Sequence, residues 1–282
     1  MKKIIFIVLG VLLLVFACSD NESPLTQSEL DIKKPTLSAL DTWLRENYTN
    51  PYNIEVSYHW NENRVDLNRY LHPPIKDSVK VAMEAIKTIW LETYNEVAGP
   101  NFVKRIAPRE ILLVGGVNRN ASGTVTLGLA EGGKRITFFN TNTLNIKNRP
   151  NLIRFVSTIQ HEYCHIINQT VPFDEEAIRK ITPSGYTAQW YETSIPDARE
   201  LGFITDYARA NVIEDFAEML TTILSYNNTD YNAIIDAIKS KKAKEAIRKK
   251  EAIVASYFKT EFDIDIYELQ SVAARNIERV LN

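Results

Sequence analysis

The chain has 282 residues, which is enough for one large domain or two small ones with a substantial hydrophobic core. Hydrophobic residues make up 45% of it and charged residues 24%, proportions that are typical of soluble globular proteins and exclude a disordered or fibrous class. The 33 basic and 35 acidic side chains give a net charge of -2, which argues against a protein that binds nucleic acid mainly through its phosphates.

The amino terminus has the pattern of a bacterial lipoprotein signal. Lys2 and Lys3 precede an apolar run over residues 4–17, which is shorter than the roughly 20 residues that a membrane-spanning helix needs. The run ends in Val-Phe-Ala-Cys, which looks like the lipobox where a signal peptidase cuts before a cysteine that then carries lipid. We therefore expect residues 1–17 to be a signal peptide and Cys18 to carry a lipid such as palmitate. An ordinary cleaved signal, with Cys18 incidental, is the alternative.

Residues 18–35 are expected to form a flexible tether between the lipid and the folded domain. They are rich in polar residues and contain two prolines, at positions 24 and 35. With Cys18 lipidated, Cys164 is the only other cysteine, so an intramolecular disulfide is excluded. We expect the folded domain to cover residues 36–282.

The first half of that domain mixes helices and strands without a repeat. Hydrophobic periodicity predicts helices over 37–48 and 77–98 and a strand over 54–60. Three short β-prone runs follow, at 110–114, 124–129 and 135–139, separated by Gly, Asn and Ser turns. We expect residues 135–140 to be the edge strand, along which an extended peptide would pair through its main chain.

The second half is predominantly helical. Helices are predicted at about 151–169, 174–180, 212–226, 229–257 with a break, and 264–281. The lysine-rich stretch 239–250 is interpreted as the solvated face of a helix rather than as a nucleic-acid patch. The predicted fold is therefore of the α+β class, with a small mixed sheet followed by a mainly helical carboxy-terminal part over about 212–282.

The pattern His-Glu-x-x-His lies within the helix predicted over 151–169, at residues 161–165. Residues four apart on a helix project from the same side, so His161 and His165 can bind one Zn²⁺ with N–Zn distances of about 2.0–2.1 Å. Glu162 would then lie beside the metal-bound water as a general base. The spacing predicts one zinc ion per chain.

The apolar residues of this helix form a single stripe at spacings of three and four: Leu152, Phe155, Val156, Ile159, Tyr163, Ile166 and Ile167. The core is expected on that side, with His161 and His165 on nearly the opposite face. The alternatives to a metal site are histidines that are buried in the core with their hydrogen bonds satisfied, or histidines that are simply exposed to solvent. Two histidines at this spacing favour the metal.

A catalytic zinc commonly has three protein ligands, so a third is needed. The longer pattern with a third histidine on the same helix fails, because Asn168 and Val171 stand at its glycine and histidine positions. Glu214 and Glu218 are four apart on the helix predicted over 212–226, and two such carboxylates repel each other without a cation. We assign Glu214 as the third ligand and Glu218 as the carboxylate that accepts the N–H of a ligating imidazole. Two solvated acidic residues are the alternative.

Several segments carry a resemblance to a known family. The residues HEYCH and GFITDYARANVIEDFAEML, at 161–165 and 202–220, look like motifs of the Bacteroidetes-type zinc-binding metallopeptidase lipoproteins, also described as substrate-import-associated zinc metallohydrolases. The segments PYNIEVSYHW, GTVTLGLAEGGKRITFFNTN and SGYTAQWYETS, at 51–60, 123–142 and 184–194, resemble further blocks of that family. The resemblance implies a zincin-like domain that is lipid-anchored to the outer membrane, facing the periplasm or the cell surface, near a TonB-dependent transporter.

The interval from Tyr207 to Glu214 is similar to that of the gluzincins, the glutamate-ligand metallopeptidases, of the anthrax lethal factor type. This similarity implies that Glu214 binds zinc and that Tyr207 aids catalysis, by hydrogen bonding to the oxyanion or to the departing nitrogen. A tyrosine that only packs at the entrance of a helix is the alternative. The expected activity is hydrolysis of peptide bonds in a peptide or protein substrate.

Other side chains near the motifs have weaker interpretations. Tyr186, Trp190 and Tyr191 are candidates for a substrate subsite, although such aromatic clusters more often pack in a core. Cys164 points away from the histidines, so we expect it to be buried and inert rather than a fourth ligand.

Two other functions fit the same residues. One is a non-catalytic, lipid-anchored accessory that binds a substrate for import and has a structural or vestigial zinc site. Glu162 discriminates against it, because a structural site has no use for a base at that position. The other is a metal-dependent amidase, which shares every residue of the site.

Overall fold

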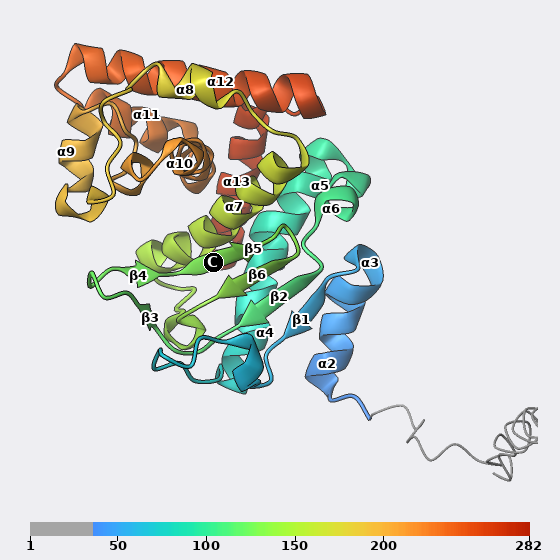
Figure 1. Ribbon diagram of the computed structural model, residues 1–282. Helices are drawn as coiled ribbons and strands as arrows, with labels where there is room; N and C mark the ends of the chain where they lie inside the picture. Colours follow the sequence, from blue (N-terminus) through green and yellow to red (C-terminus); the bar gives the residue numbers. More distant parts are fainter. Residues whose placement is uncertain (1–35) are drawn as a thin grey trace, which may run out of the picture. The chain divides into compact units, whose positions relative to one another are not determined.

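A four-stranded sheet forms in the first half of the computed structural model, which describes residues 36–282. Its strand order is β1-β2-β6-β5, with bounds β1 Glu55–Ser57, β2 Glu110–Leu113, β6 Arg135–Phe138 and β5 Gly128–Glu131 (Figure 1). The first three strands are parallel, and β5 is antiparallel to β6. A separate hairpin pairs β3, Asn118–Arg119, with β4, Val125–Thr126. The predicted signal peptide, Cys18 and tether lie outside the described residues.

The prediction that residues 135–140 form the edge strand was wrong. Residues 135–138 form β6, which lies between β2 and β5, so its two sides are already paired. On this side of the sheet the edge strand is β5, and the chain reverses from β5 into β6 through Gly132 and Gly133, both at positive φ. Periodicity identifies both segments as strands, but it carries no information about which of them lies outside.

The helices confirm the predicted α+β class. Two of them continue through a π-helical turn: α2, Ala39–Leu44, passes through Arg45–Thr49 into α3, Asn50–Tyr52, and α4, Lys76–Ile86, passes through Lys87–Leu91 into α5, Glu92–Ala98. The others are α6 Pro100–Ile106, α7 Arg149–Thr170, α8 Glu175–Arg179, α9 Ile195–Glu200, α10 Val212–Ser225, α11 Asn228–Asp236, α12 Lys241–Phe262 and α13 Ile266–Leu281. Helices α6 and α9, which are seven and six residues long, were not predicted from the sequence.

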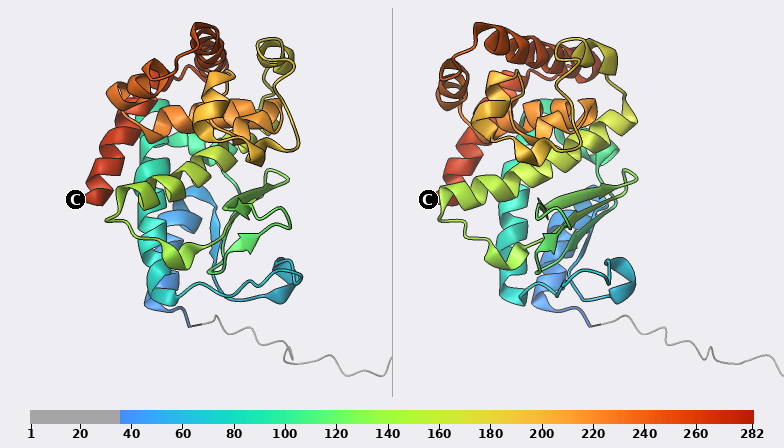
Figure 2. Two further views of the ribbon diagram at one scale, coloured as in Figure 1. Left: turned by 90° about the vertical axis from the view of Figure 1, so that its left-hand side faces the viewer. Right: turned by 60° about the vertical axis from the view of Figure 1, so that its left-hand side comes forward.

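The helix α7 lies between the sheet and the helical half, below α10 and above the strands (Figure 2). It begins after Asn148, whose side chain accepts the N–H of Asn151, and Pro150 stands in its first turn. On the core side Tyr163 contacts the rings of Trp90 and Tyr94 at centroid distances of 5.0 and 5.1 Å. These contacts fix α7 against the helix that runs from α4 to α5.

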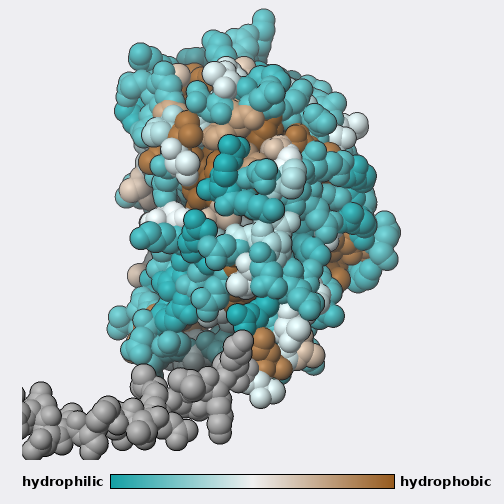
Figure 3. Space-filling view, turned by 90° about the vertical axis from the view of Figure 1, so that its right-hand side faces the viewer, coloured by the Kyte–Doolittle hydropathy of each residue, from teal (hydrophilic) through white to brown (hydrophobic). Residues whose placement is uncertain are grey.

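One hydrophobic cluster runs through the sheet and the helical half. Figure 3 shows one face, on which hydrophilic side chains predominate and apolar ones are scattered. Within residues 36–282, no helix combines the length and the apolar character that crossing a bilayer requires.

A fully buried ion pair joins α10 to α12. Lys250 Nζ lies 2.6 Å from Asp215 Oδ2, and both side chains are completely buried. Lys250 also donates to the carbonyl oxygen of Gly202 at 3.0 Å, and Tyr186 donates its hydroxyl to Asp215 at 2.8 Å. The pair holds the start of α10 in place, one residue from Glu214.

We expect Lys250→Met to lower the free energy of unfolding by about 3–5 kcal/mol, because it leaves the Asp215 carboxylate buried without its cation. Urea denaturation followed by circular dichroism measures this loss. The control is Lys249→Met, which removes an exposed lysine of the same helix. Equal stability of the two variants would contradict the role assigned to the pair.

Candidate metal centre

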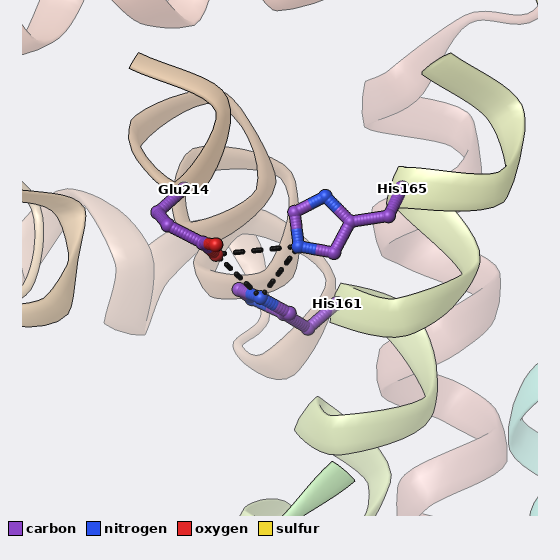
Figure 4. A group of neighbouring side chains, drawn as sticks. All are labelled: His161, His165 and Glu214. Atoms are coloured by element: carbon purple, nitrogen blue, oxygen red, sulfur yellow. Dashed lines mark hydrogen bonds and ion pairs between the residues drawn. The ribbon is translucent and has the colours of Figure 1, made fainter. Parts of the chain in front are cut away.

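Three side chains converge between α7 and α10, and they are the three ligands predicted from the sequence. His161 Nε2 lies 2.9 Å from Glu214 Oε2 and 3.0 Å from His165 Nε2, and His165 Nε2 lies 3.2 Å from the same carboxylate oxygen. Figure 4 shows the two imidazoles and the carboxylate pointing toward one another. Among residues 36–282, they are the group of His, Cys, Asp and Glu side chains suited to hold a metal ion.

Local structure accounts for this convergence. The two histidines are one turn apart on α7 and therefore share a face. Glu214 stands in the first turn of α10, where Asn211 caps the helix by accepting the N–H groups of Ile213 and Glu214. The helix packs across the histidine side of α7, so its first turn meets the imidazoles.

The structure rules out the alternative that these histidines are simply exposed to solvent. His161 is only 8% exposed and Glu162 only 7%, because α10 covers the side of α7 that lies opposite the stripe of apolar residues. A single helix pattern shows which face is most apolar, but it does not show that a second helix buries the other face.

The donor set fits a divalent zinc ion. Two imidazole nitrogens and one carboxylate oxygen are ordinary zinc ligands, and tetrahedral coordination at about 2.0–2.1 Å places ligand atoms about 3.3 Å apart. The three separations here, 2.9 to 3.2 Å, are close to that value. With three protein ligands, a fourth position would remain for water or substrate.

Glu218 supports His161 from the other side of the ring. Its Oε1 lies 2.8 Å from His161 Nδ1, and its Oε2 accepts the hydroxyl of Thr205 at 2.7 Å. A proton held on Nδ1 by this carboxylate leaves Nε2 free to bind metal. Thr205 was not predicted, since nothing in the sequence links it to the helix.

The carboxylates change the titration of His161 in the metal-free protein. Burial alone lowers its pKa, but hydrogen bonds to Glu214 and Glu218 outweigh burial and raise the pKa to about 10. Because the folded-state pKa lies above the ordinary value, the stability that this contact contributes is complete below pH 6.5 and is lost as the pH rises through about 10.

We therefore expect one of the four histidines of the metal-free protein to remain cationic at pH 8. Nitrogen-15 NMR of histidine-labelled protein, titrated from pH 6 to 11, measures this directly. Glu218→Gln should lower the midpoint of that histidine, because one of its two carboxylate partners is gone. Four histidines that all become neutral below pH 7.5 would contradict the prediction.

Glu162 lies between the histidines and the edge strand β5. Burial raises the pKa of its carboxyl, while the positive charges of His161 and His165 lower it, and the net effect is a raised pKa. A carboxyl whose pKa lies above its usual range is better matched to accepting and returning a proton near neutral pH. Its environment therefore suits a general base.

Gly128 of β5 allows the Glu162 side chain to approach the strand closely. This role of Gly128 was not predicted from the sequence. A Cβ at this position would lie 2.4 Å from Thr158 Cγ2 and 2.8 Å from Glu162 Oε1. These separations are shorter than van der Waals contact, so any side chain at residue 128 would displace Thr158, the Glu162 carboxylate or the strand itself.

We expect Gly128→Ala to lower kcat by about 100-fold, because a displacement of the order of 1 Å in a reacting group has an effect of that size. Zinc content should be unchanged, since the substitution does not touch a ligand. Leu129→Ala is the matched control, because Leu129 lies on the same strand and is 46% exposed. An unchanged kcat in Gly128→Ala would show that Glu162 does not need this close approach.

A cleft of about 490 Å³ opens onto His161 and Glu162. Tyr207 lines it from the short helical turn Tyr207–Arg209, with its ring centroid 5.8 Å from that of His161. Burial, and then the neighbouring Glu214 and Glu162, raise the pKa of Tyr207, so its hydroxyl keeps its proton and can donate it in a hydrogen bond. The structure thus places Tyr207 beside the three converging side chains.

The remaining predicted residues separate into different environments. Trp190 lines the cleft and contacts Tyr207 at a centroid distance of 4.7 Å. Tyr186 and Tyr191 do not line the cleft. Tyr186 hydrogen-bonds to buried Asp215, and Tyr191 is 41% exposed. Cys164 is fully buried, and burial raises the pKa of its thiol, in agreement with an inert side chain.

Comparisons with known proteins agree with this fold and this type of site. A family model described as "Putative zinc-binding metallo-peptidase" matches residues 33–267. The fold is similar to a crystal structure described as a "putative zinc-binding metallo-peptidase from Bacteroides caccae", with a TM-score of 0.70 and 31% sequence identity over 85% of this chain and 92% of that one. The comparison with curated proteins found no match.

Proposed function

Because the chain belongs to the family described as "Putative zinc-binding metallo-peptidase", we propose that it is a zinc-dependent hydrolase that cleaves peptide or related amide bonds. One observation carries the proposal: His161, His165 and Glu214 converge, and a cleft lined by His161 and Glu162 opens beside them. A purely structural site would not require a base of raised pKa at that position.

The residues of the chain have separate roles in this proposal. His161, His165 and Glu214 hold one zinc ion, which when bound supplies a Lewis acid that polarises a carbonyl group and lowers the pKa of water. Glu162 accepts a proton from the attacking water and returns it to the leaving amine. Tyr207 donates a hydrogen bond to the substrate oxygen or nitrogen on which charge develops.

The location of the protein is part of the proposal. The lipobox-like sequence before Cys18 supports a lipid anchor in the outer membrane, with the domain facing the periplasm or the cell surface. The family resemblance of the motifs supports a place beside a TonB-dependent nutrient import system. In that setting the enzyme would shorten peptides or proteins for uptake.

A comparison of new peptide amino termini between cells with the native protein and cells with Glu162→Ala tests the hydrolase without assuming a substrate. Termini that depend on Glu162 would identify the cleaved bonds. The alternative, a binding accessory with a structural or vestigial zinc site, is favoured if the two sets of termini are the same while zinc is retained.

A further inference from the structure

The cleft has a basic end that the proposed chemistry does not use. Ile153, Arg199, Ser225 and Tyr226 line the cleft, and the same four residues line a second cavity of about 420 Å³ that contains none of the converging ligands. They therefore mark the end of the cleft that lies away from the metal centre. Arg154 also lines the cleft, from α7.

Arg199 is held by only one of its nitrogens. Its Nε donates to the carbonyl oxygen of Ile204 at 3.0 Å, and within residues 36–282 no carboxylate pairs with it. It is half-buried, and burial lowers its pKa, which shows that the charge has lost part of its hydration without gaining an acidic partner. The two terminal nitrogens are free to bind an anion as a planar fork.

No acidic side chain of the cleft or of the adjoining cavity, which include Glu162, Asp230 and Glu278, is ion-paired with Arg199 or Arg154 within residues 36–282. Glu218 contacts His161 and Thr205, and Asp206 accepts the backbone N–H of Tyr207. Arg154 is exposed, and its guanidinium has no ion pair in the described part of the chain.

The polar side chains at this end of the cleft include a buried hydroxyl without a hydrogen-bond partner. Ser157 and Ser225 hydrogen-bond to each other at 2.8 Å across α7 and α10, and Ser225 donates to the carbonyl oxygen of Thr221. Thr221 is only 5% exposed, and its own Oγ1 has no hydrogen-bond partner. Thr221 lines the cleft, so a ligand placed there can satisfy this buried group.

We propose that Arg199, assisted by Arg154, binds a carboxylate of the peptide substrate at this end of the cleft. The inference rests on the proposed function, because it assigns a substrate class to the same cleft. Ile153 stands eight residues before His161 on α7, a rise of about 12 Å, which corresponds to roughly three to four residues of an extended peptide. The carboxylate is either the carboxy terminus of a short peptide or the side chain of an Asp or Glu about three to four residues from the cleaved bond.

Peptide binding tests this without relying on turnover. The full-length Glu162→Gln protein, supplemented with zinc, is equilibrated with hexapeptide mixtures in which the carboxy terminus is free or amidated and Asp and Glu are kept or replaced by Asn and Gln. Mass spectrometry of the retained peptides gives the enrichment of each acidic form over its amide. We expect about 10- to 100-fold enrichment, the range for hydrogen bonds to a charged group. The replacement that abolishes the enrichment identifies its source.

When Arg199→Gln is introduced into the Glu162→Gln protein, the enrichment should fall to near one. Arg199→Lys in the same protein should retain part of the enrichment. Arg179→Gln is the matched control, since Arg179 pairs with Glu175 and Glu176 on α8. Absence of enrichment, or enrichment that persists in Arg199→Gln, overturns the proposal. If enrichment depends on Arg199 while the native protein cleaves nothing, the carboxylate site stands and the hydrolase fails. If the native protein cleaves peptides but the bound peptides show no preference for the acidic forms, the hydrolase stands and the carboxylate site fails.

Discussion

Glu162→Gln is expected to lower kcat by about 10²- to 10⁴-fold, the usual contribution of a positioned general base. Glutamine keeps the size of the side chain and can still lie against Gly128, but it cannot accept a proton. Zinc content and the melting temperature should stay near the native values, because the carboxylate is not one of the three converging ligands. Steady-state kinetics on a peptide identified by the terminus comparison, together with metal analysis, measures both quantities.

Two further observations define this prediction. A loss of zinc in Glu162→Gln would mean that the residue is a ligand, contrary to its assigned role. A native kcat with zinc retained would remove the base from the mechanism. Glu176→Gln is a suitable control, because Glu176 lies on α8 and pairs with Arg179 rather than lining the cleft.

Glu214→Gln is expected to lower zinc affinity far more than Glu218→Gln does. The first change removes a charged ligand oxygen, whereas the second weakens only the support of His161, an effect of about 10- to 100-fold in metal affinity. Competition with a chromophoric chelator measures both dissociation constants under the same conditions. Equal affinities for the two variants would contradict the assignment of Glu214 as the ligand and Glu218 as its support.

The activity of the same two variants gives an independent check. Glu214→Gln should be inactive at micromolar zinc and regain little activity in excess metal, since the coordination itself is changed. Glu218→Gln should recover as zinc is added, because its three ligands remain. A Glu214→Gln protein that recovers fully with added zinc would show that another group completes the site.

The sequence predicted what depends on spacing within one helix. The positions of His161 and His165 follow from four-residue spacing, and the long helices over 149–170, 212–225 and 266–281 follow from their apolar periodicity. The pairing of Glu214 with them came from the need for a third ligand and from a carboxylate pair on one later helix. The helix features are local, and a one-dimensional pattern contains them, whereas Glu214 stands 53 residues along the chain from His161 and its assignment was also supported by the family resemblance.

Features that depend on the packing of separate elements could not be predicted in this way. The burial of His161 needs α10 to cover α7, and the edge position of β5 needs the partners of β6 to be known. Gly128 has no sequence signal, because its role is the absence of a side chain opposite Glu162. Arg199 is one of many arginines until the cleft shows that it has no acidic partner.

A crystal structure of the zinc-loaded protein, with anomalous scattering recorded above and below the zinc absorption edge, tests the central claim most directly. We expect one anomalous peak within about 2.2 Å of His161 Nε2, His165 Nε2 and a Glu214 carboxylate oxygen, with water as the fourth ligand. A peak elsewhere, or a fourth protein ligand that closes the coordination, would contradict a catalytic zinc at this position.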